Sequence, residues 1–355
     1  LLGFLPRTLK DRDAVRAFRA QKFRWKPTQF RLTSSLARNT NSSTSFTKAA
    51  SSPTDTGQVV FGLSHFWQNS ARLEFLPTAG VSASMDARQL LDLRDYRDQS
   101  ARADSADRGQ AAAAERLQLL GKDIGLERER SLTSAITFAP SVSLWFRPQL
   151  DFTSRFDLNK DPNARALLRD GDSTGAFRLP KRLGAAQTWR TGAIFDFGRL
   201  ILNTTPEKTL VHRLGRFFAP VEVRWSQGLN SNYDNTVFSP SAGYQFGLGN
   251  VNDFRGLNSR LATSAGRVKQ FSAAGSVNLP LGINVGSRFE NGTTETWTRR
   301  SLDGFQALIT SAQQTYPDYT VRWSWRPRIF PKILSLVSVN GRYVVTEQQT
   351  AVPNE

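Results

Sequence analysis

The chain has 355 residues, of which 39% are hydrophobic, and its formal net charge is +17. No stretch approaches about 18 consecutive apolar residues, which excludes a membrane protein built from spanning helices; spanning strands need only alternating residues. The absence of cysteine excludes disulfides and thiolate metal sites, and the charge allows nucleic acid, an anionic surface or a basic pore wall as partner.

The N-terminal part predicts a helix followed by three strands. Residues 1–22 are basic and amphipathic and predict a short helix. Residues 23–39 alternate, with Phe30 and Leu32 against Gln29 and Arg31, and predict the first strand. A Ser/Thr/Asn-rich loop over 40–57 precedes a strand from about 59 to 75, and residues 77–88 form a third.

Residues 89–130 are charged and Ala-rich, and they predict a solvated loop insertion that contains two short helices. Gly121 stands where a helix C-cap is expected. Alternation returns over 132–146 and 149–158, which predict the fourth and fifth strands. A polar loop over 160–186 follows.

The next segment predicts a sixth strand over 189–203 and an amphipathic helix over 205–218. Thr205 is expected as the N-cap, Pro206 as the first helical residue and Glu207 as an acid in the first turn. Pro220 ends this helix, residues 221–229 predict a strand, and 230–265 predict a loop.

Residues 271–297 predict a hairpin of two long strands around Pro280. Phe271 and Val277 alternate with polar residues on the first arm, as do Val285 and Phe289 on the second. After a loop over 299–315, two more strands are expected over 319–325 and 333–345.

These segments make about eleven long strands, and the predicted class is all-β. Short connections, one of them the helix at 205–218, alternate with long polar loops, one of which (89–130) carries the short helices. This asymmetry is typical of antiparallel up-and-down transmembrane barrels. We therefore expect residues 1–355 to form part of one large outer-membrane barrel. The odd strand number and the chain ends favour a fragment of a longer protein.

A barrel wall of this kind assigns each face of a strand a different environment. Polar-face residues are expected to line the lumen: Arg31, Arg155, Arg224, Asn284, Arg288, Arg322 and Arg342. Aromatic residues beside the short turns are expected at the membrane interface, where such rings are favoured: Trp25, Phe75, Trp145, Phe146, Trp225, Trp323 and Trp325.

The sequence indicates no catalytic residues, metal site or cofactor, and we expect a protein that is not an enzyme. His65 and His212 lack partners at a recognisable spacing. The Asp157–Asn163 segment resembles a calcium loop, but Pro162 occupies the position that requires glycine. Basic and aromatic residues fall on opposite faces, which argues against a nucleic-acid-binding surface.

Residues 316–344, YPDYTVRWSWRPRIFPKILSLVSVNGRYV, carry a recurring unit. It consists of a proline with an acid, a strand that ends in aromatic-Ser-aromatic, a basic-proline-aromatic connector and a Ser/Val strand. This unit resembles one in the SprA/Sov family, the giant outer-membrane translocons of type IX secretion. Residues 23–39, 143–180 and 241–250 look similar to other parts of such chains, so that the resemblance spans most of the sequence.

The resemblance implies a section of a wide, gated, protein-conducting barrel in the bacterial outer membrane. It also implies outer-membrane lipid, folded cargo, a PorV-like shuttle barrel, a plug protein and periplasmic factors as partners, and no catalytic residues. Two alternatives remain from the residues: a porin-like or lipid-exporting barrel, and a secreted all-β surface protein whose apolar faces are buried between two sheets.

Overall fold

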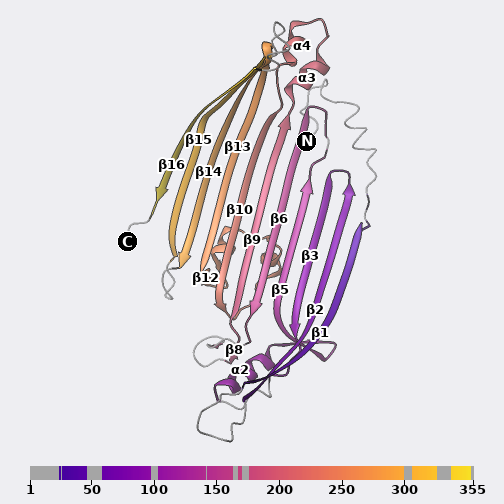
Figure 1. Ribbon diagram of the computed structural model, residues 1–355, viewed down its shortest axis with the longest axis vertical. Coiled ribbons are helices and arrows are strands. Elements are labelled where there is room, and N and C mark those ends of the chain that lie inside the picture. Colours follow the sequence, from indigo (N-terminus) through magenta and orange to yellow (C-terminus); the bar gives the residue numbers. More distant parts are fainter. Residues whose placement is uncertain are drawn as a thin grey trace.

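The protein folds into one large open sheet of long antiparallel strands (Figure 1). The computed structural model describes residues 24, 26–45, 58–96, 103–140, 142–162, 167–169, 176–299, 306–325 and 337–352. The helix predicted over 1–22 lies outside this part of the chain. The long strands are β1 (Gln29–Ser45), β2 (Gln58–Thr78), β3 (Val81–Asp92), β5 (Lys122–Phe138), β6 (Phe146–Lys160), β9 (Lys181–Phe195), β10 (Val221–Thr236), β13 (Ser264–Leu279), β14 (Ile283–Arg299), β15 (Gln306–Trp325) and β16 (Val337–Ala351).

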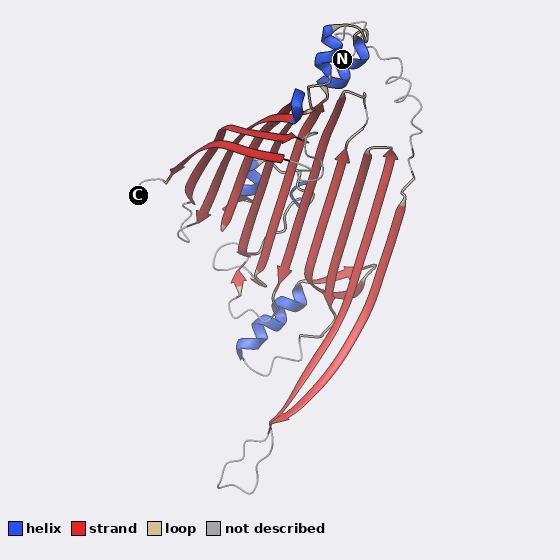
Figure 2. Cartoon of the chain, turned by 45° about the horizontal axis from the view of Figure 1, so that its top comes forward, coloured by secondary structure: helices blue, strands red, loops and turns tan. Residues whose placement is uncertain are grey.

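Each long strand pairs with the next one along the chain, in the order β1-β2-β3-β5-β6-β9-β10-β13-β14-β15-β16. The expected all-β, antiparallel arrangement is therefore confirmed. The sheet is open: in the described residues β1 and β16 end the path and do not pair with each other, and they lie on opposite sides of the molecule in both views (Figures 1 and 2).

The predicted hairpin at 271–297 is confirmed and is longer than expected. β13 and β14 pair without interruption from Ser264↔Thr298 to Leu279↔Ile283. Residues 280–282 turn the chain as a short 3-10 segment, in which Leu281 and Gly282 both have positive φ. Alternating residues are enough to predict these arms because each faces a different environment on its two sides.

The register places side chains of opposite character on the two faces of the sheet. One face, here called the polar face, carries the cross-strand row Arg224, Ser272 and Glu290. The other, here called the apolar face, carries the row Val223, Ala273 and Phe289 one residue away. Because partners in register project to the same side, each face continues across all the long strands.

The insertion predicted over 89–130 contains a helix, as expected, but the rest of it differs from the prediction. Among the described residues it contains one helix, α2 (Ala103–Ala114), and then the short strand β4 (Arg116–Leu119), which pairs back onto β5. Leu120 and Gly121 form the turn between β4 and β5, both with positive φ, so Gly121 is not a helix C-cap. A two-residue hairpin turn of type I′ requires positive φ at both positions. A glycine suits such a turn as well as it suits a helix C-cap, so the glycine alone does not distinguish the two.

The sixth strand and the following helix are also placed differently from the prediction. β9 ends at Phe195, and residues expected to continue it form helix α3 (Phe197–Thr204), capped by Asp196, whose side chain accepts from Arg199 N. Thr205 ends α3 rather than beginning a helix, and α4 (Leu210–Gly215) starts from the N-cap Thr209. Phe195 and Phe197 fit strand alternation, so only the cap at Asp196 marks the change.

Long and short connections lie at opposite ends of the sheet, as expected, but several long loops are shorter than predicted. The short-turn end holds the connections 79–80, 139–145, 196–220 and 280–282, and the long-loop end holds 93–121, 161–180 and 237–263. Residues 306–315, predicted as part of a loop over 299–315, belong to β15, which begins at Gln306. The strand predicted over 132–146 ends at Phe138.

Residues 237–263, here called the cap, fold back over the long-loop half of the apolar face. The cap contains α5 (Ala242–Gln245), α6 (Val251–Arg255), β11 (Gly256–Leu257) and β12 (Arg260–Leu261). Tyr244 packs edge-on against Phe156 and forms a 2.7 Å hydroxyl hydrogen bond with Ser231. This docking produces the main hydrophobic core.

In the part of the chain that the structure describes, none of the helices has the length and apolar character needed to cross a membrane.

Candidate functional site

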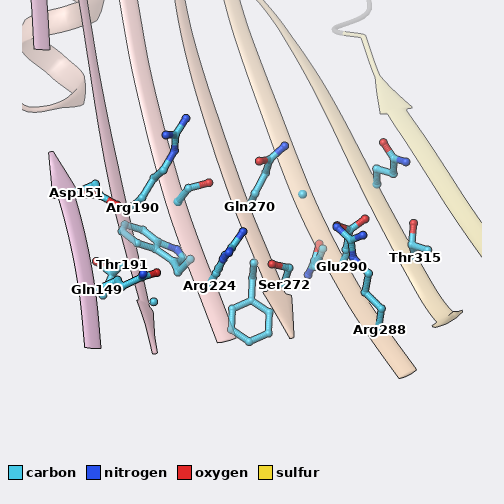
Figure 3. Close-up of a pocket in the computed structure, with 17 residues that line it drawn as sticks. Gln149, Asp151, Arg190, Thr191, Arg224, Gln270, Ser272, Arg288, Glu290 and Thr315 are labelled. Atoms are coloured by element: carbon cyan, nitrogen blue, oxygen red, sulfur yellow. The ribbon is translucent and has the colours of Figure 1, made fainter. Parts of the chain in front are cut away.

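A hollow of about 520 Å³ lies on the polar face between β6 and β15 (Figure 3). Side chains from six neighbouring strands line it, and Arg190, Arg224 and Gln270 extend from adjacent strands into the same space. We call this hollow the trough. One continuous hollow that spans six strands indicates that the sheet bends toward its polar face.

Two rows of residues in register form the floor of the trough. The first runs Gln149, Gly192, Arg224, Ser272, Glu290 and Thr315, and the second runs Asp151, Arg190, Ser226, Gln270, Gly292 and Gln313. Both rows combine charged groups with amides and hydroxyls. The floor therefore offers hydrogen-bond donors and acceptors at the spacing of neighbouring strands, about 4.8 Å.

Glycines on the polar face leave space for the trough, and their close contacts are consistent with a sheet that curves toward this face. Gly192 and Gly292 lie in the two rows and contribute no side chain. A Cβ at Gly286, in the same face, would lie 2.7 Å from Thr320 Oγ1, and one at Gly266 would lie 2.4 Å from Asn230 Oδ1. Side chains converge on the inner side of a curved sheet, so small residues are required there.

Arginines of the polar face pair with acids two positions away on the same strand. Arg72 contacts Glu74 at 2.5 Å, and Arg155 contacts Asp157 at 2.6 Å. The same arrangement occurs in Arg88–Asp86, Arg224–Glu222 and Arg288–Glu290. Positions i and i+2 of a strand project to the same side, so these pairs neutralise the face strand by strand.

All seven residues predicted to line a lumen lie on the polar face. The registers that place them there pair Arg31 with Arg72, Arg155 with Ala186, Asn284 with Arg322 and Thr320 with Arg342. Arg342 makes two 2.9 Å hydrogen bonds to Asp318 across β15 and β16. Only Arg224 and Arg288 of the seven line the trough; the others are spread over the rest of the face.

The predicted interface aromatics gather in the short-turn half of the sheet. Phe75, Phe146, Trp225 and Trp323 lie on the apolar face by register. Trp145 belongs to the connection before β6 and packs on Phe146 with ring centroids 5.8 Å apart. Trp25 lies outside the described residues, and of Trp325 only the backbone, in β15, is described.

The uncovered part of the apolar face forms a belt next to the short turns. On β13 the belt runs from Phe271 to Leu279, and both end residues are exposed. Eight strand steps span about 27 Å along the strand and about 20 Å across a membrane at a tilt near 40°, close to the apolar band of outer-membrane barrels. Polar residues follow toward the long-loop end, beginning with Lys269 and Gln227.

Beyond that border the cap covers the apolar face of the central strands, from β5 to β14. Gln187 Nε2 donates to Gly249 O at 3.2 Å, and Tyr233 Oη donates to Asp253 O and Phe254 O at 3.2 Å. Gly247 has a φ of 69°, and a Cβ there would lie 2.4 Å from Ser154 Cβ. The belt and the cap thus divide the apolar face into two zones with different environments.

A second charged cluster at the long-loop end is satisfied within the fold. Tyr96 Oη donates to Asp92 Oδ2 at 2.6 Å, and Arg94 donates to both oxygens of the same carboxylate. Burial raises the pKa of Tyr96, and its hydrogen bond to Asp92 adds to the effect. Lys160 and Glu115 form a buried pair at 3.1 Å. These contacts anchor α2 and leave no open site.

Most of the residues that line the trough were not predicted from the sequence, among them Arg190, Asp151 and Gln270. Arg190 is exposed and has no ion pair with any residue that the structure describes. The signal was present, since each lies on the polar side of a strand pattern. What alternation alone does not supply is the register between strands, which brings them into two rows.

The trough offers charged and hydrogen-bonding side chains, and none of the described residues that line it is a nucleophile with a positioned base. Groups of three or more His, Asp or Glu arranged to hold a metal do not occur among the described residues. Comparison with known proteins adds no family: no protein-family model matches the chain, and no curated protein sequence is similar to it.

Proposed function

We propose that this sheet is a section of the wall of an outer-membrane translocon barrel. Its polar face lines an aqueous conduit for exported proteins, and its apolar belt contacts lipid. The observation that carries the proposal is the segregation of the two faces, which the register maintains across eleven long strands.

Two further observations support a membrane wall. The long strands have 12 to 21 residues, whereas about 9–11 suffice to cross a bilayer when tilted. Five arginines of the polar face form ion pairs with carboxylates on their own strands, as a water-filled lumen allows. The mechanism is passive: the wall presents hydrated contacts, and the driving force for transport comes from elsewhere.

The open sheet favours a wide conduit over a small barrel. Lipid cannot form hydrogen bonds with the free backbone groups of an unpaired strand edge. A sheet that spans a membrane must therefore close. β1 and β16 run in the same direction and lie far apart (Figure 1), and closure needs additional strands. Since barrel diameter grows with strand number, the complete conduit is wider than eleven strands would make it. The resemblance to the SprA/Sov translocons adds a shuttle barrel, a plug and periplasmic factors to the proposed partners.

One observation favours a different function, that of a secreted all-β surface protein. The cap already buries part of the apolar face against protein, and a second layer of protein covering the belt would produce a water-soluble molecule. This alternative predicts that the belt contacts protein.

Site-specific photo-crosslinking in the producing cells separates these two functions. A photoreactive residue at Gln270 in the trough should crosslink to exported proteins during secretion, identified by mass spectrometry. The same residue at Val285 in the belt should crosslink to lipid only. Protein adducts at Val285 combined with none at Gln270 would overturn the translocon proposal and favour the surface protein.

A further inference from the structure

The helical connection between β9 and β10 is a compact, firmly anchored hairpin at the short-turn end (Figure 2). α3 and α4 pack through Gly198 and Gly215: a Cβ on Gly198 would lie 2.7 Å from Gly215 O. His212 is buried, with Nδ1 3.2 Å from Thr205 O. The segment after α4 joins the sheet through Asn278 N, which donates to Phe217 O at 2.7 Å.

This hairpin exposes an apolar stripe on the side that does not pack. Leu210 is 73% exposed, Val211 50% and Leu214 45%. On α4 these residues lie opposite His212 and Gly215, the two positions buried against the rest of the hairpin. A stripe of large apolar residues that is exposed to water marks a surface that contacts a membrane or another protein.

Basic side chains flank the apolar stripe. Residues 197–216 contain one acid, Glu207, and the following basic residues: Arg199, Lys208, Arg213 and Arg216. Arg199 is held by Asp196 at 3.1 Å. Arg213 and Arg216 are exposed and have no ion pair among the described residues. Apolar residues with adjacent unpaired cations match the interface of a bilayer that contains anionic lipid.

The stripe is continuous with the belt of the apolar face. Phe197 of α3 stacks on Phe195 at 6.1 Å between ring centroids, and Phe195 lies 5.1 Å from Phe146. Phe218 forms a bridge with Val277, a residue of the apolar face. The exposed turn residues Leu144 and Leu281 lie at the same end. The apolar surface therefore runs from the strands onto the hairpin.

From this geometry we propose that the α3–α4 hairpin is a binding site for anionic phospholipid at the membrane surface. Leu210, Val211 and Leu214 enter the headgroup–acyl boundary, and Arg213 and Arg216 bind the lipid phosphates. The proposal rests on the belt facing lipid, since only then does the hairpin lie at the height of the headgroups. Lipid binding by the α3–α4 hairpin fixes the depth of the wall in the bilayer.

The absence of native cysteine allows a direct test with single-cysteine variants of the chain, labelled with an environment-sensitive fluorophore. L214C probes the hairpin, V285C probes the belt, and L119C, an exposed leucine in the β4–β5 hairpin of the long-loop end, is the control. Each variant is extracted from the membrane as part of the complete conduit and reconstituted into phosphatidylcholine vesicles with and without phosphatidylglycerol, and a water-soluble quencher is added.

We expect the probe at 214 to be shielded from the quencher, more strongly with phosphatidylglycerol, while the probe at 119 stays accessible. Adding R213S and R216S to L214C should weaken the phosphatidylglycerol effect about fivefold per arginine removed. A shielded probe at 285 with an accessible probe at 214 overturns the lipid site and leaves the translocon wall standing. Accessible probes at both positions overturn both proposals.

Discussion

Arg288 and Glu290 lie two residues apart on β14 and form an ion pair on the polar face of the sheet. The pair occurs at the edge of the trough, where Arg224 with Glu222 repeats it on β10. Such pairs contribute little to folding when exposed, about 0.2–1 kcal/mol each. Their consequence is electrostatic, because five arginines of the wall each have a carboxylate beside them on the same strand.

Removing the acids of these pairs should change the charge selectivity of the conduit without unfolding the sheet. E290Q combined with E222Q leaves Arg288 and Arg224 uncompensated, so anions should pass more readily. The shift is measured as a change in reversal potential across planar bilayers under a salt gradient. E207Q, in the α3–α4 hairpin, is the matched control; equal shifts in both variants would contradict the assignment of the polar face to a lumen.

Charges introduced into the two faces should have opposite effects on assembly. V285R or F289R places a cation in the belt, which costs about 2–4 kcal/mol at mid-bilayer and should block insertion. R288S, on the polar face, should be tolerated. Membrane-extracted protein is quantified for each variant, and similar yields from the two classes would contradict the account.

The cap should detach at high pH because its docking depends on a neutral tyrosine. Burial raises the pKa of Tyr244 to about 12, and its hydrogen bond to Ser231 partly offsets this rise. The folded pKa exceeds the usual value near 10, so the stabilisation is complete below pH 10. It is lost as the pH rises from about 10 to 12.

Hydrogen exchange of residues 237–263 across this range measures cap detachment. Y244F removes the hydroxyl, should cost about 1 kcal/mol of cap docking at neutral pH, and should abolish the tyrosine-dependent part of the transition. An unchanged transition in Y244F would show that another group controls it.

The α3–α4 hairpin should be sensitive to a single methyl group. G198A directs a Cβ to within 2.7 Å of two backbone oxygens, Gly215 O and Phe218 O, so the helices must separate at a cost of about 1–3 kcal/mol. Faster hydrogen exchange over 197–215 reports this. G243A is the control because its Cβ would meet nothing within 4 Å; equal exchange in the two variants would argue against close helix packing.

Period-two alternation was enough to predict the number of long strands and the two faces. Val285 and Arg288 were assigned to opposite sides from the sequence alone, and the register bears this out. Strand ends were predicted less well, because alternation in Phe195 and Phe197 continues into a helix that depends on one capping contact at Asp196.

The cap and the trough could not be predicted because both depend on contacts between distant segments. Tyr244 is in a Gly-rich stretch without periodicity, and its partner Phe156 is far away in the sequence. Arg190 and Gln270 share a row only once β9, β10 and β13 are in register. Local patterns carry no information on that register.

The measurement that tests the central claim most directly is cysteine accessibility along β14, in the protein assembled in the membrane. Single cysteines at consecutive positions from Ile283 to Glu290 are treated with a charged, membrane-impermeant maleimide. The account predicts labelling with a period of two: positions 284, 286, 288 and 290 react, whereas 283, 285, 287 and 289 are protected by lipid. Uniform labelling of both sets would contradict a wall between lipid and water.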